Sequence, residues 1–299
     1  MDLLLSSMLV LGTPLLFAAL GGLIAERSGV INLGLEGLLL VGAFSAALSA
    51  AATHSVVIGV LVAIVVGGVG GALLGFLVIV LRADQIVIGI AFNIAALGTT
   101  GFLFGIIGPG AFRTSGEDNT RIPLLADIPF IGVLFDAHWI AFVGYALVGL
   151  VSVVLFRTGI GIRIRASGEN AEAARASGVN VLRTRMVTMA VSGGVAALGG
   201  AYMALADAHQ FGDNMIDGRG YIAFAIIILG RWKPVGVLAA AGLFAFAQGL
   251  DLFAQARSLP IPLELVQAVP YLIALATAAL LGRKATPPAE EGRPLMLAN

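Results

Sequence analysis

The sequence contains no cysteine, which excludes disulfide bonds, thiolate zinc sites and thiol nucleophiles. Charge is also scarce, because only 11% of the 299 residues are charged, whereas a soluble domain carries roughly a quarter. Basic and acidic residues balance at 17 each, which excludes a strong overall field that would attract nucleic acid. A phosphate-binding loop of the form G-x-x-x-x-G-K-[ST] is missing too, since no Lys-Ser or Lys-Thr follows the glycine cluster at 67–71.

Apolar residues dominate the sequence instead. They make up 59% of it, the mean hydropathy is +1.01, and they form runs of the length, about 20 residues, that crosses a bilayer. We expect an all-α, polytopic membrane protein with eight or nine transmembrane helices. The expected segments are Leu4–Ala25, Ile31–Ala50, Val56–Leu81, Ile86–Ile107, Trp139–Phe156, Met186–Ala206, Tyr221–Gly230, Val235–Phe253 and Leu265–Leu281. Tyr221–Gly230 is too short for a full crossing unless 217–220 belong to it, so a half-helix is the alternative.

The distribution of Lys and Arg indicates the orientation, since cytoplasmic loops are enriched in both. Most of the 17 basic residues fall on the cytoplasmic side if the N-terminus is outside and the C-terminus is cytoplasmic. We therefore expect a transmembrane domain over 1–282, with an outer loop at 108–138 and a cytoplasmic loop at 157–185. The polar tail at 283–299 is expected to be cytoplasmic and disordered. The first segment lacks a basic start and is expected to be a retained helix.

The cytoplasmic loop contains a short predicted helix at 168–178. Ser167 is the expected N-cap, Glu169 and Glu172 suit the positive end of a helix, and Gly178 suits its termination. Arginines flank it on both sides. From composition alone, the helix either inserts into a groove of another protein or is a solvated connector whose arginines follow the charge rule for cytoplasmic loops.

Four stretches carry a family resemblance: GGLIAERSGVINLGLEG (21–37), RASGENAEAARASGVNV (165–181), SGGVAALGGAY (192–202) and GRGYIAFAIIILGRWKPVG (218–236). They resemble ABC-transporter permeases of the family that imports branched-chain amino acids, simple sugars and nucleosides, and they resemble the nucleoside-type permeases most. The stretch at 165–181 is similar to the segment that couples such permeases to their ATPase.

The resemblance implies a transport subunit without catalytic activity that forms half of a translocation pathway for nucleosides in a bacterial-type inner membrane. Simple sugars or branched-chain amino acids are alternative cargoes. Separate ATPase subunits would use ATP and Mg²⁺, so this chain is expected to bind no cofactor or metal. The other implied partners are a second permease in a heterodimer, an extracytoplasmic binding protein that docks near 207–219, and membrane lipid. The residues expected to couple to the ATPase are Gly168, Glu169, Asn170, Ala173, Arg175 and Gly178.

Two rival classes are disfavoured. A secondary transporter would carry more charge within its spans for ion coupling, and a membrane enzyme would show clustered acids, histidines or nucleophiles at one depth. The three histidines are scattered among different loops and have no metal-ligand spacing.

Polar side chains at membrane depth are costly and mark candidate functional sites. The expected pathway residues are Asn93, Phe92, Thr99, Phe102 and Gln248. The alternatives are that Asn93 bonds a neighbouring helix and that the phenylalanines face lipid. Asn32 and Glu36 are expected at a broken helix start near the cytoplasmic end. There Glu36 would accept loose backbone N–H groups or pair with Arg27.

Glycines recur at four-residue spacing in two of the expected spans. Gly67, Gly71 and Gly75 form one series, and Gly101 and Gly105 form another. Such small-residue faces allow helix backbones to approach closely in lipid. We expect them to pack within one subunit, with a dimer interface as the alternative.

Overall fold

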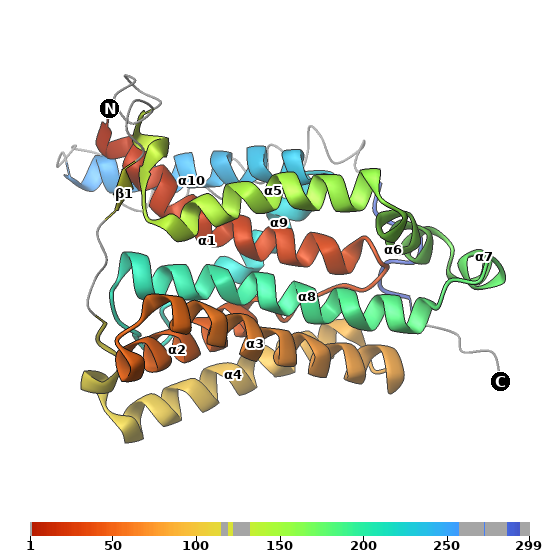
Figure 1. The fold of residues 1–299 in the computed structure, drawn as a ribbon, viewed down its shortest axis with the longest axis horizontal. Coiled ribbons are helices and arrows are strands. Elements are labelled where there is room, and N and C mark those ends of the chain that lie inside the picture. The colour runs from red at the N-terminus through yellow and green to blue at the C-terminus, as the bar shows by residue number, and fades with distance from the viewer. Residues whose placement is uncertain (1, 115–118, 122–131, 257–271, 273–285, 294–299) are drawn as a thin grey trace.

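The computed structural model describes residues 2–114, 119–121, 132–256, 272 and 286–293. Long helices lie side by side along one axis, and two short helices, α6 and α7, project at one end (Figure 1). The helices are α1 (Asp2–Glu26), α2 (Leu35–Thr53), α3 (Val56–Gly75), α4 (Gln85–Ile107), α5 (Trp139–Arg157), α6 (Gly159–Glu169), α7 (Ala171–Ala176), α8 (Val181–Tyr202), α9 (Arg219–Leu229) and α10 (Pro234–Ala256).

The remaining elements are short. π-helical turns at Phe76–Val80 and Met203–Asp207 extend α3 and α8, and 3-10 turns lie at Pro109–Phe112 and Gly132–Phe135. Strands β1 (Thr120–Arg121) and β2 (Asp136–Ala137) pair antiparallel, with Thr120 opposite Ala137. The described part of the chain is therefore mostly helical, as the sequence predicts.

Within the described part of the chain, 7 helices are long and apolar enough to cross a membrane. Together with α9, which has only 11 residues, they account for every predicted segment except Leu265–Leu281, which falls outside the described residues. Helix α8 corresponds to the predicted segment Met186–Ala206 but begins earlier, at Val181. It does so because the Asn180 side chain accepts the Arg183 N–H and caps the helix.

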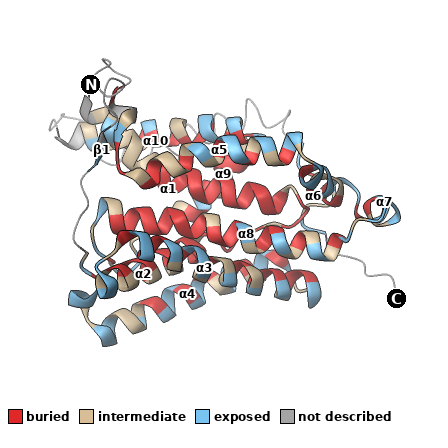
Figure 2. Ribbon diagram, in the orientation of Figure 1, coloured by how far each residue is buried: buried red, intermediate tan, exposed pale blue. Residues whose placement is uncertain are grey.

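Helices α1 and α8 form the centre of the bundle. In the most apolar stretch of each, 78% of the residues are buried inside the protein, compared with 22% in α4. Figure 2 shows the same contrast, with buried residues along α1 and α8 and exposed residues along α3 and α4. A soluble core would leave polar groups outside, whereas the exposed residues of α4 include Ile94 and Ile106. This face therefore suits lipid or another membrane subunit.

Glycines allow α3 and α8 to pack backbone against backbone. A Cβ at Gly71 would collide with the Met189 carbonyl, and a Cβ at Gly67 would collide with Gly193. The prediction that this glycine series packs within one subunit is confirmed. In the second series, Gly105 has nothing within 4 Å and Gly101 lies against the Asp213 side chain, so among the described residues this series makes no close contact with another helix.

Residues 286–293, called the tail segment below, pack against the end of the bundle where α6 and α7 lie. The Glu290 N–H donates to the Gly168 carbonyl at 2.8 Å, and Pro288 is buried. The prediction of a disordered tail is wrong for these residues, because Gly29 lacks a side chain and leaves room for Glu290. The tail segment lies near the last turn of α1, at the opposite end from residue 2.

Replacement of Gly71 by valine should destabilise the protein by about 1–3 kcal/mol, the usual cost of overpacking a close contact. Gly149→Val is the matched control, since Gly149 has nothing within 4 Å. Thermal unfolding of the purified variants in detergent measures the difference. Equal stability of the two variants would contradict the close α3–α8 contact.

Candidate translocation and coupling sites

One crossing of the bundle is interrupted halfway. After α8 and its extension, the chain turns back along α4: Phe211 contacts Phe104 with ring centroids 5.3 Å apart, and Asp213 lies against Gly101. Further on, Tyr221 accepts a hydrogen bond from Asn93. From residue 104 to residue 93 this path descends about 16 Å along α4, at 1.5 Å per residue.

The interrupted crossing thus has a non-helical half, 208–218, and a helical half, α9. The half-helix alternative for the seventh segment agrees with this arrangement. The expectation that 207–219 forms an outer docking surface is corrected for the second part of that stretch, which lies at the depth of Asn93 because Tyr221 bonds to Asn93.

The Glu36 carboxylate accepts backbone N–H groups at the start of α9. The two oxygens of Glu36 accept the Gly218 N–H at 2.7 Å and the Gly220 N–H at 2.6 Å. The first N–H groups of a helix lack partners within the helix and favour negative charge. These two hydrogen bonds are of the kind predicted for Glu36, an acceptor for loose backbone N–H groups. Its alternative partner, Arg27, instead donates to the Trp232 carbonyl at 2.7 Å.

Glu36 lies deeper than predicted. Its neighbour Gly37 donates its N–H to Asn93 Oδ1 at 2.8 Å, so Glu36 is level with Asn93. That is about 12 Å along α4 from its start at Gln85. The prediction of a position near the cytoplasmic end is therefore wrong. The reason is that the chain after Gly29 re-enters the bundle as a non-helical segment before α2 begins.

Asn93 ties three segments together. Besides accepting from Gly37, its Nδ2 donates to the Leu33 carbonyl at 2.9 Å and to the Tyr221 hydroxyl at 3.1 Å. It is buried in this arrangement, with 6% of its surface exposed. These bonds match the alternative in which Asn93 bonds neighbouring helices, and its contact with cargo stays a prediction.

Asn32 forms the predicted broken start of α2. Its Oδ1 accepts the Gly34 N–H at 3.1 Å, and its Nδ2 donates to Ser192 Oγ at 2.9 Å. These bonds satisfy polar groups of the non-helical segment 30–34 inside the bundle, where unpaired groups are costly.

Of the other predicted pathway residues, three lie on α4 and one lies on α10. On α4, Thr99 and Phe102 are exposed, with Phe102 67% exposed, whereas Phe92 packs over Gly37. Gln248 lies on α10 next to Gly249, which contacts Leu4 of α1. Figure 1 shows α10 and α4 on opposite sides of the bundle, so Gln248 is not brought to the α4 group.

Several polar residues of the interrupted crossing were missed by the sequence reasoning. Asp213, Asn214 and Asp217 are exposed, and Tyr221 is 47% exposed. Charged groups at this depth face water or protein, because exposure to hydrocarbon costs several kcal/mol. Irregular backbone inside a membrane is tolerated for the same reason only where it lines a wet cavity or is covered. The available signal was the polar run directly before an apolar segment too short to cross.

Aromatic packing fixes the entry of the interrupted crossing. Phe44, Phe104, Phe112 and Phe211 form a cluster with ring centroids 5.0–5.6 Å apart. The Arg113–Gln210 bridge adds backbone pairing beside it. The cluster joins α2 and α4 to the 3-10 turn Pro109–Phe112 and to the non-helical half 208–218. It therefore holds the non-helical half in place at the end away from α6 and α7.

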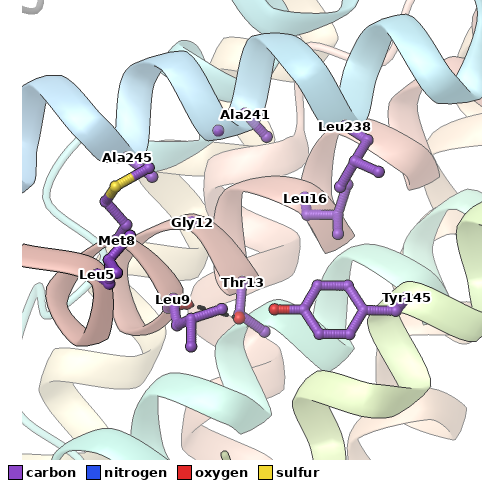
Figure 3. A pocket seen from close by; sticks show the side chains of 11 residues that line it. Leu5, Met8, Leu9, Gly12, Thr13, Leu16, Tyr145, Leu238, Ala241 and Ala245 are labelled. Carbon is purple, nitrogen blue, oxygen red and sulfur yellow. Dashed lines mark hydrogen bonds between the residues drawn. The ribbon is translucent and has the colours of Figure 1, made fainter. Parts of the chain in front are cut away.

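A separate apolar cavity of about 150 Å³ lies between α1, α5 and α10. Figure 3 shows the Tyr145 ring pointing its hydroxyl toward Thr13, whose own hydroxyl donates to the Leu9 carbonyl at 2.7 Å. The rest of the lining is apolar. This cavity has little with which to select a polar solute, and it is not part of the interrupted crossing.

The loop at 157–185 forms two helices, α6 and α7, in place of the single one predicted. Ser167 lies buried inside α6 and donates to the Arg163 carbonyl, so its prediction as a cap is wrong. Asn170 is the cap, because its Oδ1 accepts the Ala173 N–H at 2.9 Å. Gly168 and Glu169 consequently belong to the end of α6. A Cβ at Gly168 would collide with the Arg27 carbonyl.

Helix α7 has one buried side and one open side. Ala171 and Ala174 are buried, whereas Glu172, Ala173 and Ala176 are exposed. The helix ends before Gly178, whose φ of +84° suits glycine, as predicted. Arg175 is half-buried. The result is a short helix with small outward side chains, held on the bundle by its alanines.

The charged end of α6 lies close to the last turn of α1. Burial lowers the pKa of Arg27, and the negative charge of Glu169 opposes this shift. Arg27 and Arg165 both lie over the Phe156 ring, at 5.6 and 5.2 Å from its centroid. In the described part of the chain, no group of three or more His, Cys, Asp or Glu side chains could hold a metal ion.

Because the chain has no cysteine, a single introduced thiol reports whether water reaches the interrupted crossing. In the assembled transporter in membranes, Asp213→Cys should react readily with a water-soluble maleimide, since thiolates form in water. Val65→Cys, at an exposed apolar position of α3, should not. The outcome that contradicts a wet pathway is an unreactive thiol at 213 that reacts only after denaturation.

Comparisons with known proteins agree with this architecture. The family described as "Branched-chain amino acid transport system / permease component" matches residues 4–278. The guanosine ABC transporter permease protein NupQ of Bacillus subtilis is 36% identical, over 97% of this chain and 95% of its own length. The nucleoside ABC transporter permease protein NupC of Lactococcus lactis is 32% identical, over 98% and 96%.

A third relative differs in its named cargo. The putative glucose ABC transporter permease protein TsgC13 of Haloferax volcanii is 33% identical, over 86% of this chain and 79% of its own length. No solved structure matches the chain. The family match covers nearly all the helices described above, and the full-length relatives are membrane transport subunits. The chain therefore belongs to the ABC-transporter permease family of branched-chain amino acid transport system components.

Proposed function

We propose that this permease imports nucleosides, with the interrupted crossing as its pathway wall. The observation that carries the proposal is the exposed polar strip formed by Asp213, Asn214 and Asp217, which runs from the level of Gly101 toward that of Asn93. Carboxylate and amide oxygens accept hydrogen bonds from ribose hydroxyls, and amide N–H groups donate to base edges. The rings of Phe102 and Tyr221 are exposed nearby and offer faces on which a base can stack.

The relatives named for guanosine and nucleosides support this cargo. The relative named for glucose favours a monosaccharide as the second candidate, since a hexose offers similar hydroxyl groups. A branched-chain amino acid fits less well, because its apolar side chain gains nothing from Asp213 and Asp217.

The cargo is decided by competition. In proteoliposomes with the complete transporter, unlabelled nucleosides should abolish uptake of labelled guanosine, because they share ribose and base. Excess glucose or leucine should leave it unchanged. Inhibition by glucose but not by adenosine or cytidine would move the assignment to a sugar.

The same exposed strip supports a transporter that contains two permease subunits. In a single chain, Asp213 and Asp217 would face hydrocarbon, which is costly. A second permease laid against the open face of α4 closes the pathway and covers these groups. We assign that role to a different permease in a heterodimer. An outer binding protein would deliver cargo over 108–138 and the start of the interrupted crossing. The chain is then a multi-pass protein of the inner membrane, with its N-terminus outside and its tail cytoplasmic.

The cytoplasmic partner in this proposal is an ABC ATPase, which binds ATP and Mg²⁺. The outward face of α7 is small, capped at Asn170 and ended at Gly178, and so fits a groove in the ATPase. Glu169, Ala173 and Arg175 would border the contact. The exposure of Ala173 supports this role. On a solvated connector this position could carry a side chain of any size, whereas insertion into a groove requires a small one.

Ala173→Trp should abolish ATP-driven uptake, because a large ring prevents α7 from entering the groove. Ala52→Trp is the control, as Ala52 is exposed at the far end of α2. Uptake into proteoliposomes and co-purification of the ATPase measure the effect. Uptake by Ala173→Trp equal to that of Ala52→Trp would exclude α7 as the coupling element.

A further inference from the structure

The tail segment contacts three parts of the chain at the α6–α7 end. Its Glu290 N–H donates to the Gly168 carbonyl of α6 at 2.8 Å. The Glu290 carboxylate lies 3.9 Å from the Arg185 guanidinium of α8. Gly292, at a φ of +74°, lies beside Ile31 in the link between α1 and α2. Gly168 is two residues before Asn170, the cap of α7, so the tail segment holds the base of α7.

Arg185 explains why an acidic tail docks at this place. Its side chain is 1% exposed; its Nε donates to the Ser28 carbonyl and its Nη2 to the Ser167 carbonyl, both at 3.0 Å. These carbonyls carry only partial charge, and a buried cation needs an anion nearby. Glu290 supplies that anion. Without the tail segment, Arg185 would keep only these two neutral carbonyl acceptors.

A second carboxylate of the tail meets a buried one. Glu26 is fully buried, and its Oε2 accepts the Trp232 indole N–H at 2.6 Å. Glu26 Oε1 and Glu291 Oε2 are both buried without a hydrogen-bond donor, and the two side chains interact with each other. Two adjacent carboxylates do not both ionise readily, so one proton held between them supplies the missing donor.

Burial raises the pKa of Glu291 to about 7, against the opposing effects of its contact with Glu26 and of the Arg27 charge. The charged and titratable groups around the tail segment are Glu26, Arg27, Arg165, Glu169, Arg175, Arg185, Glu290 and Glu291.

We infer that Glu290 and Glu291 are positioning residues for energy coupling, because the tail segment fastens the α6–α7 joint to α1 and α8. The inference rests on the proposed coupling role of α7. A push on α7 reaches the membrane helices only if the base of α7 is attached to them. The hydrogen bond to Gly168 and the pairing with Arg185 provide that attachment.

We expect the attachment of the tail segment to weaken as the pH rises. The pKa of Glu291 is raised from an ordinary value of 4.5 to about 7 when docked. The contribution of Glu291 to docking is therefore fully present below about pH 4.5 and is lost as the pH rises through about 7, because the released tail loses its proton more readily. Glutamine at position 291 is permanently neutral and should remove this dependence.

Docking can be measured directly because the chain has no cysteine. In the reconstituted transporter, the double variant Ile31→Cys, Gly292→Cys should form an intramolecular disulfide faster at about pH 6 than at about pH 8. Thiol reactivity alone gives the opposite trend, since the thiolate fraction rises with pH. Addition of Glu291→Gln should abolish the decline at high pH. A rate that rises with pH equally in both backgrounds would overturn the proton-dependent attachment.

Coupling is measured as cargo imported per ATP hydrolysed. The paired variant Glu290→Ala, Glu291→Ala and a chain lacking 286–299 should both hydrolyse ATP with a loss of import, whereas Glu291→Gln should retain import and lose its pH dependence. Import per ATP at the full-chain value in the truncated transporter would overturn the inference. If the truncated transporter keeps normal import per ATP while Ala173→Trp is inactive, only the role of the tail segment is excluded and the role of α7 stands. Normal uptake by Ala173→Trp would instead exclude the proposed coupling through α7.

Discussion

The Glu36 carboxylate is the group on which the interrupted crossing depends. It accepts the N–H groups of Gly218 and Gly220, which begin a helix far from either membrane surface. A helix start without partners in that environment costs several kcal/mol. Because Glu36 satisfies these groups, the chain before α9 is free to be non-helical. Asn93 then fixes the geometry by bonding both re-entrant segments to α4.

The non-helical half allows polar side chains to reach the middle of the bundle. The turn-rich chain exposes Asp213, Asn214 and Asp217 beside α4, where Asp213 lies against Gly101. The low burial of α4 agrees with the proposal of a second permease subunit, which would cover this open face.

At the opposite end, a buried arginine gathers the inner elements. Arg185 bonds the α1–α2 link and α6, and it lies near Glu290 of the tail segment. The α6–α7 joint is therefore attached at its base, while the outward face of α7 stays exposed. The interrupted crossing and the joint are connected through α1, α2 and α8, the best-packed helices of the bundle. The proposed coupling through α7 requires a rigid connection of this kind.

The sequence by itself determined the membrane class, the approximate spans, the short seventh segment, the α3 glycine contact and the family, because apolar runs and local motifs are one-dimensional features. It also indicated that Glu36 accepts backbone N–H groups. Only the tertiary structure decided the depth of Glu36, the cap at Asn170, the position of Gln248 away from α4, the exposed aspartates and the docked tail. Each of these depends on contacts between residues far apart in the chain, such as Glu36 with Gly218 and Glu290 with Gly168. Spacing along the sequence does not encode such distances.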